Sequence, residues 1–153
     1  MNKLWLIRNL KKLGATEKQL LDIFYKHCRS ILEYCVPVLN SGLTKNEENR
    51  IERVQKIGFS IIKGRFFYDG YKGAVADFKA KTLKERRRII CEKFSVRAYN
   101  DKQFNQWFQY YTHNDRVTRT EKPVLKPVPF RTRKFQKSPL AQMTEFLNNK
   151  FKS

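Results

Sequence analysis

The acidic residues are the first place to look for catalytic chemistry, because metal-dependent polymerisation, hydrolysis and phosphoryl transfer need clustered carboxylates. The chain has 14 Asp and Glu among its 153 residues, and they are scattered along it. The one adjacent pair, Glu47 and Glu48, follows Thr44 at the spacing of a helix start, where acidic side chains stabilise the helix dipole. The sequence also lacks a glycine-rich phosphate-binding loop and a dinucleotide-binding fingerprint. We therefore expect no catalytic centre, no metal site and no cofactor.

The cysteines and histidines offer metal ligands and nucleophiles, but their spacing favours neither role. Cys28 and Cys35 are seven residues apart in a helical pattern, which separates them by about 10 Å along the axis, too far for a disulfide. A zinc site built from these two with His27 and Cys91 has no recognised ligand spacing. We expect reduced cysteines in the core of an intracellular protein, located in the cytoplasm or the nucleus.

Surplus positive charge is the strongest chemical signal in the chain. Its 33 Lys and Arg exceed its 14 Asp and Glu, so the net charge is +19 and the pI is about 10.1. A charge of this size attracts polyanions, and nucleic acid is the expected partner. A membrane is not expected as a partner, because the chain has no long apolar run and its cations are spread over several segments.

Basic residues recur on single faces of the expected helices. Arg86, Lys93 and Arg97 are separated by seven and four residues, which places them on one stripe of a helix. Lys11 and Lys12 belong to an N-terminal helix that contains no acidic residue. A single basic stripe is more often a solvated face with internal ion pairs, but the repetition leaves cations that pairing within helices does not neutralise. These residues are candidate phosphate contacts.

The segment 129–137 interleaves the rings Phe130 and Phe135 with cations. Cations can bind phosphates while aromatic rings stack on unpaired bases. The same rings could instead anchor the segment to a helical core, and the sequence favours neither reading. Its candidate phosphate contacts are Arg131, Arg133 and Lys134.

Helices must position these side chains. Apolar residues recur at helical spacing, and Thr-x-x-Gln or Thr-x-x-Glu capping boxes begin at Thr16, Thr44 and Thr82. Gly14 ends the first helix, and Pro37 is expected to stop the second. The expected helices span residues 2–13, 16–35, 44–63, about 72–79, 82–99 and 138 onward, with a short aromatic helix over residues 104–111.

These elements predict an all-α fold, a small helical bundle with a basic extended C-terminal segment and a terminal amphipathic helix. The helical domain is expected over residues 1–111, a basic proline-containing linker over residues 112–137, and the C-terminal helix over residues 138–153. The linker is expected to be extended because residues 116–137 hold three prolines and eight cations against one acid.

Several segments, in matching order and spacing, resemble the C-terminal region of non-LTR retrotransposon reverse transcriptases of the jockey-like type. They are residues 4–14, 29–38, 51–56 and 82–87, followed by residues 131–140. In that family the polymerase fingers and palm, with the metal-binding aspartates, lie upstream of a helical thumb and C-terminal extension. This chain lacks the Tyr/Phe-x-Asp-Asp motif, and it has Leu39 where the family pattern usually has Trp.

The resemblance implies a non-catalytic, thumb-like part of an RNA-directed DNA polymerase. Such a domain would bind RNA or an RNA–DNA hybrid through the phosphate backbone, with the upstream palm and fingers as a second partner and no activity alone. Two alternatives stay open. One is a degenerate transposon-derived helical protein with no specific nucleic-acid role, and the other is a protein-interaction module that docks its terminal helix, residues 140–147, into a partner.

Overall fold

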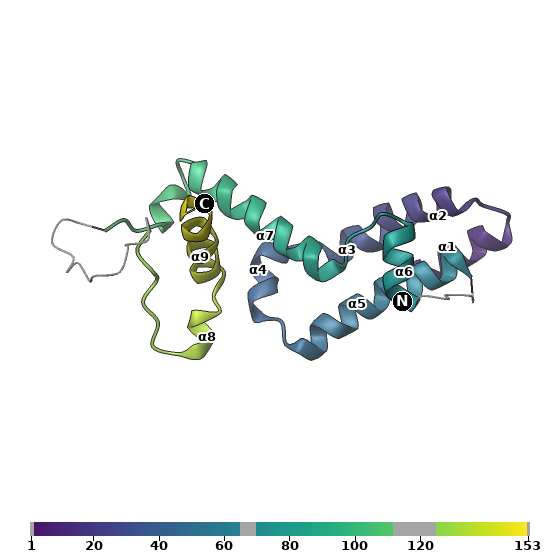
Figure 1. Cartoon of the computed structure of the whole chain (residues 1–153), viewed down its shortest axis with the longest axis horizontal. Coiled ribbons are helices and arrows are strands. Elements are labelled where there is room, and N and C mark those ends of the chain that lie inside the picture. Colours follow the sequence, from purple (N-terminus) through teal and green to yellow (C-terminus); the bar gives the residue numbers. More distant parts are fainter. Residues whose placement is uncertain (1, 65–69, 112–124, 153) are drawn as a thin grey trace. The chain divides into compact units, whose positions relative to one another are not determined.

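The structure is a computed structural model that describes residues 2–64, 70–111 and 125–152 (Figure 1). Regular secondary structure in these residues is helical, and Tyr110 and Leu125 form an isolated antiparallel β-bridge. The expected all-α class is therefore confirmed for the described part of the chain. None of the described helices is both long and apolar enough to cross a lipid bilayer.

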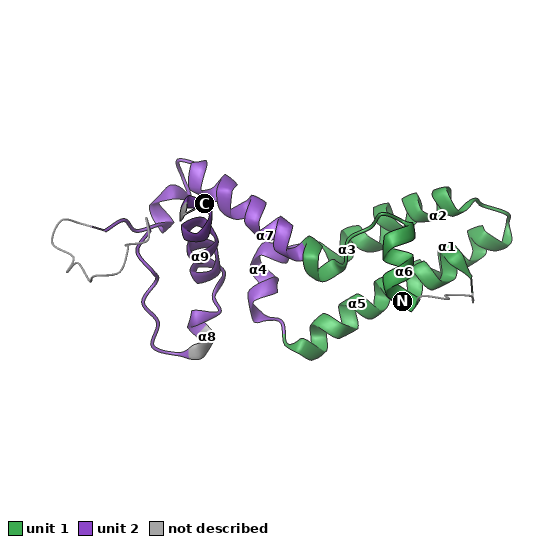
Figure 2. Cartoon of the chain, in the orientation of Figure 1, with its two compact units in different colours: residues 1–34, 44–86 green, residues 35–43, 87–153 purple. Residues whose placement is uncertain are grey.

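The chain folds as two compact units, which Figure 2 colours separately. Unit 1 comprises residues 1–34 and 44–86, and unit 2 comprises residues 35–43 and 87–153. This division differs from the expected helical domain ending near residue 111. The expected boundary was based on charge and proline content, which do not show which helix faces pack together. The grouping of residues 35–43 with residues 87–153 could therefore not be predicted from the sequence.

Unit 1 is helical, and its helices that start at Asn2, Glu17, Lys45 and Leu83 begin within one residue of the predicted starts. The helical elements of this unit are α1 (Asn2–Lys12), α2 (Glu17–Ile23), the π-helical turn η1 (Phe24–Arg29), α3 (Ser30–Leu32), α5 (Lys45–Lys63), α6 (Gly70–Asp77) and the first residues of α7 (Leu83–Asn100). At the start of α2 the Thr16 amide donates to Gln19 Oε1 at 3.0 Å, and at the start of α5 the Thr44 amide donates to Glu47 Oε2 at 2.8 Å. Both capping boxes are confirmed.

Aromatic rings form the centre of the unit 1 core. Phe24 and Phe59 are fully buried, and their ring centroids lie 5.5 Å apart in an edge-to-face arrangement. Gly58 on α5 allows this approach, because a Cβ at that position would overlap the Phe24 ring. Ile7 from α1 and Leu20 from α2 belong to the same buried cluster.

The helix expected over residues 16–35 is interrupted, and the prediction that Pro37 stops it is wrong. Regular α-helix gives way to a π-turn over Phe24–Arg29, and α3 ends at Leu32. Cys35 then adopts a left-handed conformation with φ of 55°, which turns the chain before the proline is reached. Pro37 lies in the first turn of α4 (Val36–Leu39), where its missing N–H has no helical partner to lose.

The start of α7 is held by an acidic residue from another helix. The Glu85 amide donates to Thr82 Oγ1 at 3.2 Å, as the third capping box predicts. In addition, the Glu52 carboxylate on α5 accepts from the backbone amides of Leu83 at 3.2 Å and Lys84 at 3.3 Å. A carboxylate at a helix N-terminus satisfies amides that lack helical partners and complements the helix dipole, so Glu52 holds the first residues of α7 within unit 1.

Unit 2 combines the rest of α7 with helical elements that lie before and after it in the sequence. They are α4, the 3₁₀ turn η2 (Asn40–Gly42), the 3₁₀ turn η3 (Asn105–Trp107), α8 (Arg133–Gln136) and α9 (Pro139–Lys152). The buried cluster contains Ala98 from α7, Phe108, Leu125, and Met143 and Leu147 from α9. The apolar face of the terminal helix is therefore covered within its own unit.

The expected linker is only partly tested, because residues 112–124 lie outside the described residues. Beyond them, the segment is not a solvated extended chain throughout. Leu125 is fully buried, and its backbone N–H and C=O bond to the side-chain amide of Asn148 on α9, at 2.8 and 3.0 Å. Thr132 then caps the short helix α8, where the sequence predicts an extended linker. The Thr132 cap and the hydrogen bonds between Asn148 and Leu125 therefore give regular structure to residues whose composition predicts an extended chain.

Candidate nucleic-acid interface

Two of the predicted phosphate contacts are engaged inside unit 1. Lys11 Nζ donates to the backbone carbonyls of Ile61 at 2.7 Å and Ile62 at 2.8 Å, near the end of α5. A cation at this position satisfies terminal carbonyls and complements the negative end of the helix dipole. The structure thus gives Lys11 a role in holding α1 to α5.

Arg86 is the second residue with an internal role. Its guanidinium donates to both carboxylate oxygens of Glu33, at 2.9 and 2.7 Å, and Arg29 Nε donates to the same carboxylate at 2.8 Å. Burial acts to raise the pKa of Glu33, but the hydrogen bonds from Arg86 and Arg29 outweigh it, so the pKa is lowered. Arg86 therefore does not share a free stripe with Lys93 and Arg97, contrary to the sequence prediction.

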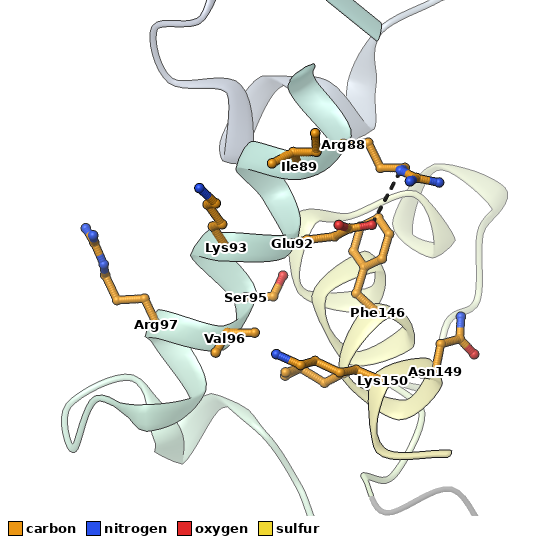
Figure 3. A pocket seen from close by; sticks show the side chains of 11 residues that line it. Arg88, Ile89, Glu92, Lys93, Ser95, Val96, Arg97, Phe146, Asn149 and Lys150 are labelled. Carbon is orange, nitrogen blue, oxygen red and sulfur yellow. Dashed lines mark ion pairs between the residues drawn. The ribbon is translucent and has the colours of Figure 1, made fainter. Parts of the chain in front are cut away.

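Lys93 and Arg97 are the predicted contacts that the structure brings together. They lie one turn apart on the part of α7 that belongs to unit 2, and both are exposed. Neither forms an ion pair with any described residue. Figure 3 shows both side chains extending from the same side of α7. This pair has the free charge that a phosphate contact requires.

The two cations are among the residues that line a groove of about 800 Å³ between α7 and α9, and in the view of Figure 3 their side chains extend away from α9. Its charged lining residues are Arg88, Lys93, Arg97 and Lys150 against one acid, Glu92. Arg88 Nε lies 3.5 Å from Glu92 Oε1, and both side chains are largely solvated, so this pair is weak. The groove, which we call the α7/α9 groove, carries an excess of three positive charges.

The floor of the α7/α9 groove is apolar. Ile89 and Val96 come from α7, and Phe146 and Leu147 come from α9. The buried Ser95 contributes little polarity, because its hydroxyl donates to the Cys91 carbonyl at 2.8 Å. A trough with an apolar floor and cationic edges fits a chain that has charged phosphates and flat sugar and base faces.

Two further predicted contacts, Lys12 and Arg131, do not line this groove, and the side chains of two others are not described. Lys12 is exposed on α1 in unit 1, and Arg131 is exposed in unit 2 without lining the groove. Arg133 and Lys134 lie in α8, and their side chains lie outside the described residues.

Sequence reasoning missed Lys150 as a groove residue. It lines the groove from α9, three residues beyond the buried Leu147. The helical pattern of residues 140–147, continued by one turn, would have placed Lys150 next to the apolar face. The sequence predicts Arg88 only as a member of a second basic stripe on α7. Whether it lines the groove depends on how α9 packs, which the sequence does not show.

Unit 1 has a second, more open groove of about 890 Å³ between α1, α5 and α6. Arg8, Arg53 and Lys56 supply its cations. The Tyr71 hydroxyl in its lining donates to Glu52, and burial together with that carboxylate raises the pKa of Tyr71. Because Glu52 also caps α7, the polar part of this groove is engaged in holding unit 1 together.

The described residues contain no group of three or more His, Cys, Asp and Glu that could hold a metal ion. The three cysteines are free thiols, with Cys28 and Cys91 buried and Cys35 exposed. Burial raises the pKa of the Cys28 and Cys91 thiols, which lowers their reactivity at neutral pH. They act as small core residues.

Comparison with protein-family models, with curated proteins and with solved structures gives no match for this chain.

Proposed function

We propose that the chain binds nucleic acid through the phosphate backbone, with the α7/α9 groove as the principal contact surface. In this proposal it acts as a non-catalytic, thumb-like part of an RNA-directed DNA polymerase of a non-LTR retrotransposon, holding RNA or an RNA–DNA hybrid. The observation that carries the proposal is the pair Lys93 and Arg97, exposed on successive turns and free of carboxylate partners among the described residues.

The net charge of unit 2 also supports binding of nucleic acid. Unit 2 contains 15 Lys and Arg and 5 Asp and Glu, a net charge of +10. An excess of positive charge raises the local concentration of polyanions and speeds their association, and unit 1, with a net charge of +9, shares this effect. Phosphate contacts made by Lys and Arg carry no sequence information, so the expected binding is largely independent of nucleic-acid sequence.

The resemblance of residues 4–14, 29–38, 51–56 and 82–87 to reverse transcriptases supplies the biological context. Under this proposal the upstream palm and fingers would provide the metal-binding carboxylates, and this chain would grip the primer and template. We expect no nucleotide incorporation by the pure chain in a primer-extension assay.

The terminal helix offers less support for a protein-docking module. Met143 and Leu147 are 6% and 1% exposed because they pack within unit 2, so this face is not available to a partner's groove. Phosphate binding is therefore the better supported function.

A salt titration of binding tests the proposal. Affinity for a labelled single-stranded RNA would be measured by fluorescence anisotropy over a range of salt concentrations, for the wild-type chain and a Lys93→Ala/Arg97→Ala double variant. Loss of two phosphate contacts should reduce the slope of log K against log salt by about 1.4 for a single strand and about 1.8 for a duplex.

The matched control is the double variant Lys18→Ala/Lys72→Ala, which removes the same charge from exposed positions of unit 1. Its slope should stay near that of the wild-type chain. Equal slopes for all the proteins, or equal affinity for heparin and RNA with no effect of the groove variant, would contradict a specific role for the α7/α9 groove.

A further inference from the structure

A second, smaller cavity of unit 2 lies on another side of α9. It has a volume of about 340 Å³ and lies between the segment that follows Leu125, α8 and α9. Pro127, Val128 and Phe130 form its apolar wall. We call it the Phe130 pocket.

The position of Phe130 is fixed by the chain around it. Asn148 holds the backbone of Leu125, accepting from its N–H through Oδ1 and donating to its carbonyl through Nδ2, and the Lys126 amide donates to the Gln109 carbonyl at 2.7 Å. Pro127 and Pro129 each restrict a backbone φ angle between this anchor and the ring. Phe130 nevertheless remains 52% exposed, so it does not serve as an anchor. Leu125, fully buried, takes that role.

The polar groups of the pocket fall into two sets. Asn148 is engaged with Leu125, and Thr144 Oγ1 donates to the Leu140 carbonyl at 2.9 Å. Gln136, Glu145 and Asn149 form no hydrogen bond or ion pair through their side chains with any described residue. The pocket thus combines an open ring face with two amides and a carboxylate that are free to bind a ligand.

Asn149 connects this pocket to the site already described. It lines both the Phe130 pocket and the α7/α9 groove. A polymer whose phosphates follow the groove can therefore direct a side group across α9 into the pocket. Arg131 and Lys137 are exposed next to the lining residues Phe130 and Gln136 in the sequence, so this part of unit 2 also attracts an anionic polymer.

We propose that the Phe130 pocket binds an unpaired nucleobase of a single-stranded nucleic acid, stacked on Phe130 and bonded along its edge by Gln136, Glu145 and Asn149. This inference rests on the proposed function, and it specifies the substrate class as single-stranded RNA or DNA. Bases of a duplex are stacked and paired, so they cannot enter the pocket. The Glu145 carboxylate accepts hydrogen bonds from an exocyclic amine, which favours cytosine over uracil.

The test compares labelled oligomers of about ten nucleotides, a length within the range of single-stranded binding sites. The probes are oligocytidylate and oligouridylate in RNA form, oligodeoxycytidylate, and an RNA duplex. Phe130→Ala should weaken binding of the single strands by at least about fivefold, because base stacking on a ring is lost, and leave duplex binding within about twofold. Phe130→Trp should restore single-strand binding.

The Glu145→Gln variant tests recognition of the base edge. The wild-type chain should bind oligocytidylate about threefold more tightly than oligouridylate, and the variant should lose this preference. Tyr34→Ala, which removes an exposed ring from unit 1, is the matched control and should change neither measurement. Comparison of the RNA and DNA forms identifies which sugar the site prefers.

The outcomes separate the two proposals. If the Lys93→Ala/Arg97→Ala variant loses salt-dependent binding while Phe130→Ala binds every probe as the wild-type chain does, phosphate binding stands and the base pocket is overturned. If Phe130→Ala weakens only the single strands, the pocket is supported whatever the groove variant does. A Phe130→Trp variant that remains as weak as Phe130→Ala would overturn stacking.

Discussion

Units 1 and 2 have similar net charges and different ratios of acid to base. Unit 1 contains 18 Lys and Arg with 9 Asp and Glu, a net charge of +9, and unit 2 contains 15 with 5, a net charge of +10. Several acids of unit 1 are paired with cations: Glu33 with Arg29 and Arg86, and Asp77 with Lys63. Net charge alone therefore does not locate a polyanion site.

The difference lies in what the cations contact. Lys11 and Arg86 in unit 1 hold helices together through carbonyl or carboxylate oxygens, whereas Lys93 and Arg97 in unit 2 are exposed beside an apolar-floored groove. A cation already paired with a carboxylate must break that pair before it binds phosphate. This contrast makes unit 2 the better candidate interface, and substitutions in each unit can break or sharpen it.

The largest effect is expected from Glu33→Gln in unit 1. This change removes the carboxylate that pairs with the buried Arg29 and with Arg86, and leaving a buried cation unpaired should destabilise the fold by about 3 kcal/mol. Urea unfolding measures the loss. Glu85→Gln, which breaks a solvated pair with Lys81, should change stability by less than about 0.5 kcal/mol. Equal effects of the two variants would contradict an internal role for the unit 1 acids.

Stability should also depend on pH through Glu33. Because its folded pKa is lowered from the usual value of 4.5, Glu33 contributes stability that is present above pH 4.5. That contribution is lost as the pH falls through the lower, folded pKa, where the carboxylate becomes protonated. Urea unfolding at a series of pH values should show the difference between wild type and Glu33→Gln shrinking over this acid range. A difference that stays constant down to pH 3 would be inconsistent with the ion pairs.

Asn148→Ala should have the next largest effect, and it acts in unit 2. The substitution removes two hydrogen bonds to the buried backbone of Leu125 and should cost about 2 kcal/mol. Gln142→Ala on the same helix is the control, with an expected change below about 0.5 kcal/mol. Thermal unfolding gives both values. If Asn148→Ala also weakens single-strand binding, the docked segment positions Phe130 as proposed.

Local signals explain why much of the fold could be predicted from the sequence. Capping boxes at Thr16 and Thr44 and the apolar spacing from Leu83 to Asn100 act within one or two turns, so residues close in sequence determine them. The π-turn over Phe24–Arg29 lacks a marker of this kind. It interrupts a segment whose apolar spacing is typical of a regular helix.

The candidate site was harder to predict because residues that are distant in the sequence determine whether a cation is paired or free to bind phosphate. Lys11 meets carbonyls 50 residues away, and Arg86 meets Glu33 across 53 residues. On a helix stripe these residues look the same as Lys93 and Arg97. The spacing of Arg86, Lys93 and Arg97 correctly placed three cations on α7, but it could not show that the first of them would be paired.

The smallest effect is expected from Glu92→Gln in the α7/α9 groove. This variant is also the most direct test of the difference between the two units. The pair of Glu92 with Arg88 is solvated, so stability should change by less than about 0.5 kcal/mol. Removing the groove's acid also removes repulsion of phosphate and releases Arg88, so affinity for single-stranded RNA at low salt should rise about twofold to threefold. Glu85→Gln on the same helix, but in unit 1, makes the same charge change and should leave affinity unaltered. If both variants raise affinity equally, binding responds to net charge alone and the contrast between the units has no functional meaning.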